Sequence, residues 1–295
     1  MQSEGFERLA QLGWLTGVTR RQWLRHGVMG VAAGALSGAG SLGYAWGVER
    51  HRLVVEENRL NLRGLGAGWV GVRVAHLSDL HLEPWTKEAH LVAAVERTNA
   101  LRPDAVVLTG DFVTDSWQAG DAVAEILSDL RAPQGVWACL GNHDHWNRPN
   151  TIAKALARRG VNVLRNEAVV LERFGDRLAI AGTESAWSGR PDVAAAVRAV
   201  PGGIPVLLLA HEPDFASLAA STGRIGAQLS GHTHGGQVRF GPWAPVLVNM
   251  GRQYVMGAYR VGSMSLYVNR GLGCVGIPLR FGAPPEITVH TLAAA

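Results

Sequence analysis

The chain has 295 residues, of which 47% are hydrophobic and 18% are charged, and this is enough to form one large core or two modest ones. Its formal net charge of +4 comes from scattered side chains without a long run of Lys or Arg, which argues against nucleic acid as a partner. The two cysteines are Cys139, expected to be a buried small side chain, and Cys274. Their spacing does not decide whether they form a disulfide.

The N-terminal segment has the pattern of an export signal. Arg20 and Arg21 precede an uncharged stretch rich in Gly and Ala, residues 27–47, and this resembles a bacterial twin-arginine signal. The resemblance implies export by the twin-arginine machinery, with the protein working outside the cytoplasm or staying anchored in the cell membrane. The alternative is a short apolar core helix behind a chance arginine pair. We assign residues 1–48 to a signal or membrane anchor and residues 49–295 to one catalytic domain.

The first half of this domain is predicted to alternate strands with helices. Apolar runs predict strands over residues 72–78, 104–109 and 135–140, and helical periodicity predicts helices over residues 88–100 and 121–130. The nearly all-apolar second run is typical of a strand buried on both faces of its sheet. In such a pattern, the residues that follow the strands gather at the carboxyl edge of the sheet, where α/β folds build their sites.

The second half is predicted to be richer in strands. Two hairpins are expected over residues 168–181 and 254–268, single strands over residues 205–210 and 226–230, and a final strand over residues 286–292. Two packed sheets flanked by helices account for this order of elements. The fold class is therefore predicted to be mixed α/β, behind an N-terminal signal or anchor helix.

Five of the predicted strands end in short motifs that carry metal-ligand side chains. These side chains are Asp79, His81, Asp111, Asn142, His211, His232 and His234. Oxygen and imidazole donors without a thiolate suit a pair of catalytic divalent transition ions better than one closed structural zinc site. Asp79 and His81 are two residues apart, so in an extended strand end they face the same way and can hold one ion. Any single motif is more often a turn or a surface pair, but their joint occurrence favours a metal centre.

Residues 70–292 resemble the calcineurin-like metallophosphoesterase superfamily, because all five motifs occur in the order found in that superfamily. The resemblance implies a four-layer αββα sandwich of two mixed β-sheets flanked by helices, and two divalent transition-metal ions (Mn, Fe, Zn or Ni). It implies that the first ion is held by Asp79, His81, Asp111 and His234, and the second by Asp111, Asn142, His211 and His232. The leader, together with residues 231–237, 270–273 and 284–287, is similar to the exported YkuE/YaeI-type phosphodiesterase branch.

The same resemblance implies the chemistry. His143 would be the histidine that binds no metal and protonates the leaving group, or stabilises its charge, and Asp144 would orient it. A hydroxide bridging the two ions would attack phosphorus in line with the leaving oxygen. The expected substrate is a small-molecule or lipid-linked phosphodiester or pyrophosphate.

Two other functions are compatible with the sequence. A hydrolase of the pyrophosphate bond of UDP-2,3-diacylglucosamine would need its active site on the cytoplasmic face behind an uncleaved anchor. A non-catalytic metal-bound module at the membrane would have no need of His143, so an intact His143 argues against it.

Several residues near the motifs have two interpretations. Five tryptophans could form an apolar rim for a lipid or a flat substrate group: Trp85, Trp117, Trp146, Trp187 and Trp243. Packing within the loops is the favoured interpretation of these side chains. Arg270 and Arg280 could meet phosphate or form fold-stabilising salt links. His145 adjoins the site, whereas Glu184 and Ser185 are not assigned to it. Histidines expected to be structural are His76, His90 and His290.

Overall fold

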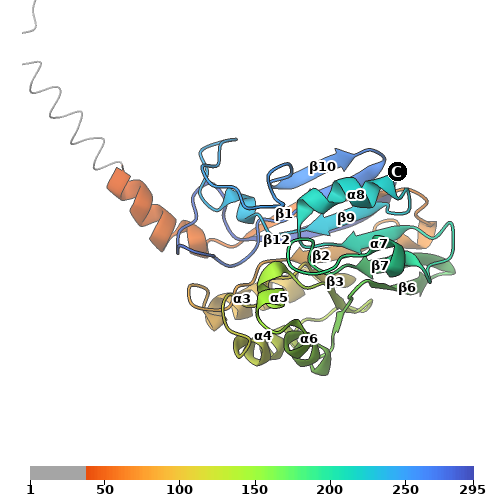
Figure 1. Cartoon of the computed structure of the whole chain (residues 1–295), viewed down its shortest axis with the longest axis horizontal. Coiled ribbons are helices and arrows are strands. Elements are labelled where there is room, and N and C mark those ends of the chain that lie inside the picture. The colour runs from red at the N-terminus through yellow and green to blue at the C-terminus, as the bar shows by residue number, and fades with distance from the viewer. Residues whose placement is uncertain (1–37) are drawn as a thin grey trace, which may run out of the picture. The chain divides into compact units, whose positions relative to one another are not determined.

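Figure 1 shows the computed structural model, which describes residues 38–295. The arginine pair and most of the predicted signal lie outside the described residues, while residues 38–47 are helical. Among residues 38–295, no helix has both the length and the apolar character needed to cross a membrane. Residues Ala45–Ala295 form one compact unit.

The first of two six-stranded sheets has the strand order β1-β12-β2-β3-β4-β5. Its strands are β1 (Val54–Leu62), β2 (Arg73–Leu77), β3 (Ala105–Leu108), β4 (Val136–Ala138), β5 (Val161–Val163) and β12 (Glu286–Ala294). The last strand of the chain lies between the first two, parallel to β1 and antiparallel to β2. From β2 to β5 all neighbours are parallel. The sheet is therefore mixed, and its order depends on β12.

The second sheet has the order β10-β11-β9-β8-β7-β6. Its strands are β6 (Glu167–Arg173), β7 (Asp176–Gly182), β8 (Val206–Leu209), β9 (Ala227–Ser230), β10 (Gly257–Val261) and β11 (Met264–Val268). Both predicted hairpins are present, since β6 pairs antiparallel with β7 and β10 with β11. The inner pairs β7–β8, β8–β9 and β9–β11 are parallel, so this sheet is mixed as well.

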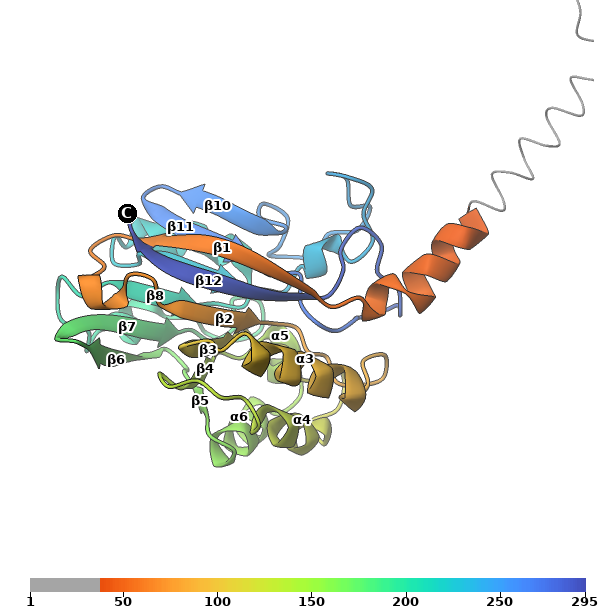
Figure 2. The same ribbon diagram turned by 180° about the vertical axis from the view of Figure 1, so that it is seen from behind.

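Helices cover the outer face of each sheet, as Figure 2 shows for the first sheet and Figure 1 for the second. Those on the first sheet are α3 (Glu88–Ala100), α4 (Ala119–Leu127) and α6 (Pro149–Arg158), and those on the second are α7 (Val193–Val197) and α8 (Ala216–Ser221). The short elements are α5 (Asn142–Trp146), η1 (Glu49–His51), η2 (Ala67–Trp69), η3 (Pro213–Phe215) and η4 (His234–Gly236).

Three apolar clusters separate the four layers. In β2 and β3, Ala75 and Val106 face the helices of the first sheet, while Val74 and Val107 face the second sheet, because side chains of a strand alternate between its two faces. A third cluster joins the second sheet to α7 and α8. The predicted mixed α/β fold, with two mixed sheets flanked by helices, is confirmed.

Some elements differ from the prediction. Helix α4 covers Ala119–Leu127 rather than residues 121–130. Strand β1 was not predicted, because its sequence carries four polar or charged residues in a row, 56–59, at a half-exposed position on the sheet edge. Helix α6 was not predicted either, although Pro149 at its first position is a typical helix start.

Two buried histidines pack against each other in the first sheet. His290 on β12 lies with its Nε2 3.4 Å from Nδ1 of His76 on β2, and the other nitrogen of His76 contacts the Thr109 hydroxyl at 2.8 Å. Burial lowers the pKa of His290 to about 3. Burial and the neighbouring His290 lower the pKa of His76 well below its usual value. Both rings are therefore neutral in the folded protein, in agreement with a structural role.

The burial of neutral His290 predicts that the folded protein loses stability in acid, and that the His290→Gln variant loses less. Below pH about 6.5 the unfolded chain takes up a proton at His290 that the folded chain does not, so the group costs stability as the pH falls. Between about pH 7.5 and about pH 5 the wild type should lose roughly 2 kcal/mol more of its free energy of unfolding than the variant. Urea titrations in excess EDTA would measure this. Equal losses in both proteins would show that His290 is not the cause.

Candidate metal centre

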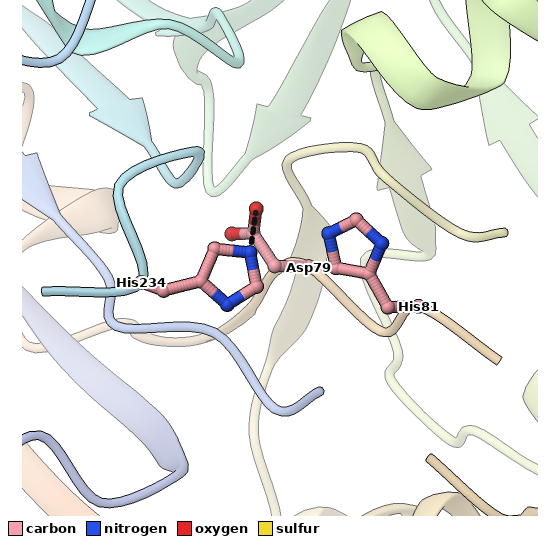
Figure 3. Close-up of side chains that lie close together, drawn as sticks. All are labelled: Asp79, His81 and His234. Carbon is pink, nitrogen blue, oxygen red and sulfur yellow. Dashed lines mark ion pairs between the residues drawn. The ribbon is translucent and has the colours of Figure 1, made fainter. Parts of the chain in front are cut away.

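The predicted ligands lie in loops at the carboxyl ends of β2, β3, β4, β8 and β9. All seven are buried: Asp79, His81, Asp111, Asn142, His211, His232 and His234. Figure 3 shows three of them, Asp79, His81 and His234, with their side chains close together. The strand ends thus bring together residues as distant in the sequence as Asp79 and His234, which are 155 positions apart.

The backbone at these residues is unusual. Five of the seven have a positive φ: Asp79 (50°), His81 (45°), Asp111 (54°), His232 (72°) and His234 (51°). For residues with a side chain this left-handed region costs roughly 1–3 kcal/mol each, and it persists only where the surrounding structure enforces it. Of the twelve non-glycine residues with a positive φ among residues 38–295, five are thus predicted ligands, so this strain coincides with the predicted site.

One group of donors consists of Asp79, His81 and His234, whose ligand atoms all lie within 4.8 Å of one another. Nε2 of His234 is 3.4 Å from Oδ1 of Asp79. The Asp79 carboxylate also accepts the backbone N–H of His232, at 2.9 Å to Oδ1 and 3.0 Å to Oδ2. Nε2 of His81 is buried without a hydrogen-bond partner. A donor atom left unpaired in a buried polar site fits a metal ligand.

A second group consists of Asp111, His211 and His232. Nδ1 of His211 lies 2.6 Å from the Thr109 carbonyl, and Nε2 of His232 lies 2.7 Å from the Asn249 carbonyl. Because a carbonyl only accepts, these two nitrogens carry the protons. The other ring nitrogens, Nε2 of His211 and Nδ1 of His232, then face each other at 3.2 Å. Nε2 of His211 also lies 3.1 Å from Oδ2 of Asp111.

Such a cluster of lone pairs and carboxylates requires positive charge. Burial by itself lowers the pKa of His211, but the carboxylates of Asp111 and Asp79 raise it well above its usual value. Burial raises the pKa of Asp111, whereas His211 and His81 lower it well below its usual range. Without metal, a proton on His211 therefore supplies the charge that a cation would bring. Metal ligation by histidine needs the neutral ring, so the residues fit a divalent ion that replaces this proton.

Asn142 supplies the remaining predicted ligand atom. It is the first residue of α5, preceded by Gly141 in the short loop that follows β4, and its Oδ1 is buried without a hydrogen-bond partner. A neutral amide oxygen of this kind is a suitable ligand for a hard or borderline cation. Its role as a ligand stays a prediction.

Glycines allow the loops to approach this closely. A Cβ on Gly231 would lie 1.8 Å from Oγ of Ser78 and 2.2 Å from Oδ2 of Asp79. A Cβ on Gly141 would lie 2.2 Å from Oδ1 of Asp111. Neither position can carry a side chain without displacing a carboxylate of the site.

His143 lies at the edge of the metal cluster. Its ring is 4.7 Å from that of His81, and its Nδ1 is 2.8 Å from the Thr114 carbonyl. Its backbone N–H donates to Oδ1 of Asp111 at 2.9 Å. Burial lowers the pKa of His143. The structure thus holds the His143 ring beside the predicted ligands. Its Nδ1 is bonded to the Thr114 carbonyl, and Nε2 is the other ring nitrogen.

Asp144 has partners that differ from those the resemblance implied. Its carboxylate accepts the backbone N–H groups of Asp111, Phe112 and Gly141, each at 2.9 Å. The group that fixes the His143 ring is instead the Thr114 carbonyl. Burial and the neighbouring Asp111 raise the pKa of Asp144 to about 7, but its oxygens accept all of these hydrogen bonds, so Asp144 holds together the loops that follow β3 and β4. It orients His143 only through the backbone.

Further positioning residues were not predicted. Glu212 is buried beside His211, and its carboxylate accepts the Ser185 hydroxyl and the backbone N–H of Ala186. His145 pairs with Glu184, which also accepts Nε of Arg165 at 2.6 Å. These contacts connect the loop after β7 to α5 and η3.

The sequence could have indicated only one of these residues. Glu212 follows a predicted ligand directly, and this position was a usable signal for a positioning role. The carbonyls of Thr109, Thr114 and Asn249 leave no signal, because every residue has one.

Two of the tryptophans line the site. The Trp146 ring lies 4.6 Å from that of His143 and 5.2 Å from that of Trp187, which in turn lies 5.6 Å from that of His232. Both are partly exposed. Trp117 instead packs under the guanidinium of Arg148. Trp146 and Trp187 thus lie beside a predicted catalytic residue and a predicted ligand, whereas Trp117 shows the loop packing that was favoured.

Of the two arginines, Arg270 forms the salt links of the structural interpretation, whereas Arg280 forms no ion pair within residues 38–295 and its Nη2 lies 3.3 Å from Nδ1 of His234. Arg270 pairs with Glu56 at 2.6 Å and with Glu286 at 2.5 Å. Arg280 is fully buried and donates to the carbonyls of Arg270 and Ala283, among others. Their charges are used within the fold.

The fold and the site define a class of protein. Residues 72–236 match the calcineurin-like phosphoesterase family, and the chain belongs to this family of metallophosphoesterases, which makes it a hydrolase. It is similar to the uncharacterized metallophosphoesterase YkuE of Bacillus subtilis, with 36% identity over 93% of this chain and 98% of that protein. It is also similar to the phosphodiesterase YaeI of Escherichia coli, with 30% identity over 75% of this chain and 82% of that protein. The NAD nucleotidase of Haemophilus influenzae superposes with a TM-score of 0.47 at 15% identity, over 68% of this chain and 45% of its own.

Gly231→Ala tests the packing of the centre. The added methyl group must displace Asp79, so metal binding should weaken by roughly 10–100-fold, as it does when groups that support ligands are changed. Gly202→Ala is the matched control, because a Cβ there meets nothing within 4 Å. Metal content after dialysis against dilute chelator would compare the two. If both variants retain the same metal, Asp79 is not constrained in the way described.

Proposed function

We propose that this protein is a dinuclear metal-dependent phosphoesterase that hydrolyses a phosphodiester or pyrophosphate bond. The observation that carries the proposal is that the two donor groups meet at Asp111, which also forms a third group with His81 and His143 in the described residues. This residue belongs to the second group and its Oδ2 lies 3.4 Å from Nε2 of His81 in the first. One carboxylate can therefore serve both ions. The name of the Escherichia coli relative, a phosphodiesterase, supports a diester as substrate.

The chain's own residues would bind the ions and deliver a proton. Two divalent ions would neutralise charge on the phosphoryl group and lower the pKa of a coordinated water towards neutrality; Mn, Fe, Zn and Ni all suit these donors. While the water oxygen, after losing a proton, forms its bond to phosphorus and the bond to the leaving oxygen breaks, His143 in its doubly protonated form would transfer the proton on Nε2 to that oxygen. The ring would keep the Nδ1 proton that it donates to the Thr114 carbonyl, and the proton released by the water would restore the one on Nε2. The Thr114 carbonyl and the N–H bond to Asp111 keep the His143 ring in place for this step.

The proposal extends to location. The arginine pair and the uncharged residues 27–47 support export by the twin-arginine machinery or retention as a membrane anchor, with residues 49–295 as the catalytic domain. The substrate would then be a small or lipid-linked phosphoester outside the cytoplasm.

Hydrolysis of bis-p-nitrophenyl phosphate tests the function. The wild type should cleave this diester with Mn²⁺, Zn²⁺, Fe²⁺ or Ni²⁺ and not in EDTA. His143→Ala should reduce kcat by about 10²–10⁴-fold, the usual contribution of a general acid, while its metal content stays that of the wild type. The exposed His51 gives a matched control, and His51→Ala should retain full activity.

The outcomes separate the role of His143 from that of the metals. Loss of metal together with activity in His143→Ala would make His143 a ligand or a structural residue. A metal-loaded wild type that is inert towards both this diester and p-nitrophenyl phosphate would contradict a general phosphodiesterase.

A further inference from the structure

A loop that begins and ends at the metal cluster carries an exposed apolar surface. It covers residues 237–249 and follows η4, and the backbone N–H of Gln237 donates to the His234 carbonyl at 2.9 Å. At its far end the Asn249 carbonyl accepts Nε2–H of His232 at 2.7 Å. Both ends of the loop therefore contact predicted ligands, and its tip lies outside the site.

The tip of this loop is apolar. Residues 240–251 contain no charged side chain, and Phe240, Trp243 and Val246 are exposed to 55%, 61% and 72%. The rings of Phe240 and Trp243 stack at 5.9 Å. Large apolar side chains that gather on a surface without charged neighbours mark an interaction site.

The exposure is built into a well-connected loop. Arg239 is nearly buried and donates to the carbonyls of Gly235, Gly241 and Pro242 at 2.8, 2.9 and 3.3 Å. The backbone N–H of Phe240 donates to the Trp243 carbonyl at 2.8 Å. The aromatic rings are therefore held outward by the loop's own hydrogen bonds.

A second uncharged segment extends this surface. Residues 271–279 have no charged side chain, and Ile277 is 49% exposed. Nε2 of Gln237 donates to the Ile277 carbonyl at 3.1 Å and so joins the two segments. In Figures 1 and 2, the light-blue loop after η4 and the dark-blue segment before β12 lie at the same end of the domain as the orange η1.

Trp46 completes the surface at the start of the domain. Its ring is 57% exposed and lies 5.3 Å from the guanidinium of Arg50, which donates to the Pro278 carbonyl at 3.4 Å. The backbone N–H of Arg280 donates to the Ala45 carbonyl at 3.2 Å. The compact unit that begins at Ala45 therefore starts at this surface, and in the sequence it follows the uncharged residues 27–44.

We propose that Trp46, Phe240, Trp243, Val246 and Ile277 form a docking surface for a lipid bilayer. Exposed Trp and Phe beside an Arg are the residues that favour the interface between lipid headgroups and hydrocarbon. The uncharged sequence that reaches the domain at the same place argues for a membrane rather than a protein partner. This inference concerns binding alone and does not depend on the proposed reaction.

A polarity-sensitive label on the loop tests the proposal. Cys139 and Cys274 are buried, so a nitrobenzoxadiazole label attaches selectively to the new thiol of Trp243→Cys in the full chain. The matched control is Phe174→Cys, because Phe174 is 86% exposed in the β6–β7 turn, outside this surface. Vesicles of phosphatidylethanolamine and phosphatidylglycerol are added, and flotation of the protein is measured in parallel.

With vesicles, the label at position 243 should shift its emission to shorter wavelength and brighten several-fold, while the label at position 174 should not change. Flotation with an unchanged signal at position 243 would overturn the proposal, because the protein would then bind through another part. A protein that does not float would overturn it as well. A shift without lipid, accompanied by a dimer in light scattering, would assign the surface to a second copy of the chain.

Discussion

The buried carboxylates of Asp79 and Asp111 impose the main electrostatic constraint on this structure. A carboxylate removed from water is costly unless hydrogen bonds and positive charge compensate it. The backbone N–H groups of His232 and His143 supply hydrogen bonds to the two carboxylates, but they do not neutralise two negative charges. The histidine nitrogens that face these carboxylates complete the compensation only with a proton or a cation. The loops of the site are therefore arranged around a positive charge.

This constraint accounts for the local backbone. Five strand ends must turn their side chains into one small volume, and the chain does so by placing Asp79, His81, Asp111, His232 and His234 in the left-handed region. Glycines at positions 141 and 231 lie where a methyl group would collide with the two carboxylates. Asp144 and Glu212 then fix the neighbouring loops through backbone N–H groups. The strain at the ligands is thus maintained by hydrogen bonds to residues outside the set of predicted ligands.

The sequence was sufficient to predict the order of layers and the set of converging side chains. Helix α3 and both hairpins were predicted because their periodicity and turn residues are local properties. The hydrogen-bond partners of Asp144 were not, because they are backbone groups brought close by folding. The tautomers of His211 and His232 depend on the carbonyls of Thr109 and Asn249, which any residue could provide. Strand β1 was missed because residues 56–59 are polar or charged, and its partner in the sheet, β12, lies more than two hundred positions away.

The position of β12 has a consequence for biosynthesis. Val54 pairs with Glu286 and Leu62 with Ala294, so β1 has no partner in the first sheet until the C-terminal strand has left the ribosome. Until then β2 also presents an unpaired edge, of the kind that recruits other chains. Contacts of such long sequence separation slow folding. Until β12 is synthesised, the first sheet of the nascent domain therefore remains incomplete. A chaperone that covers the edges of β1 and β2 would protect the domain during that interval.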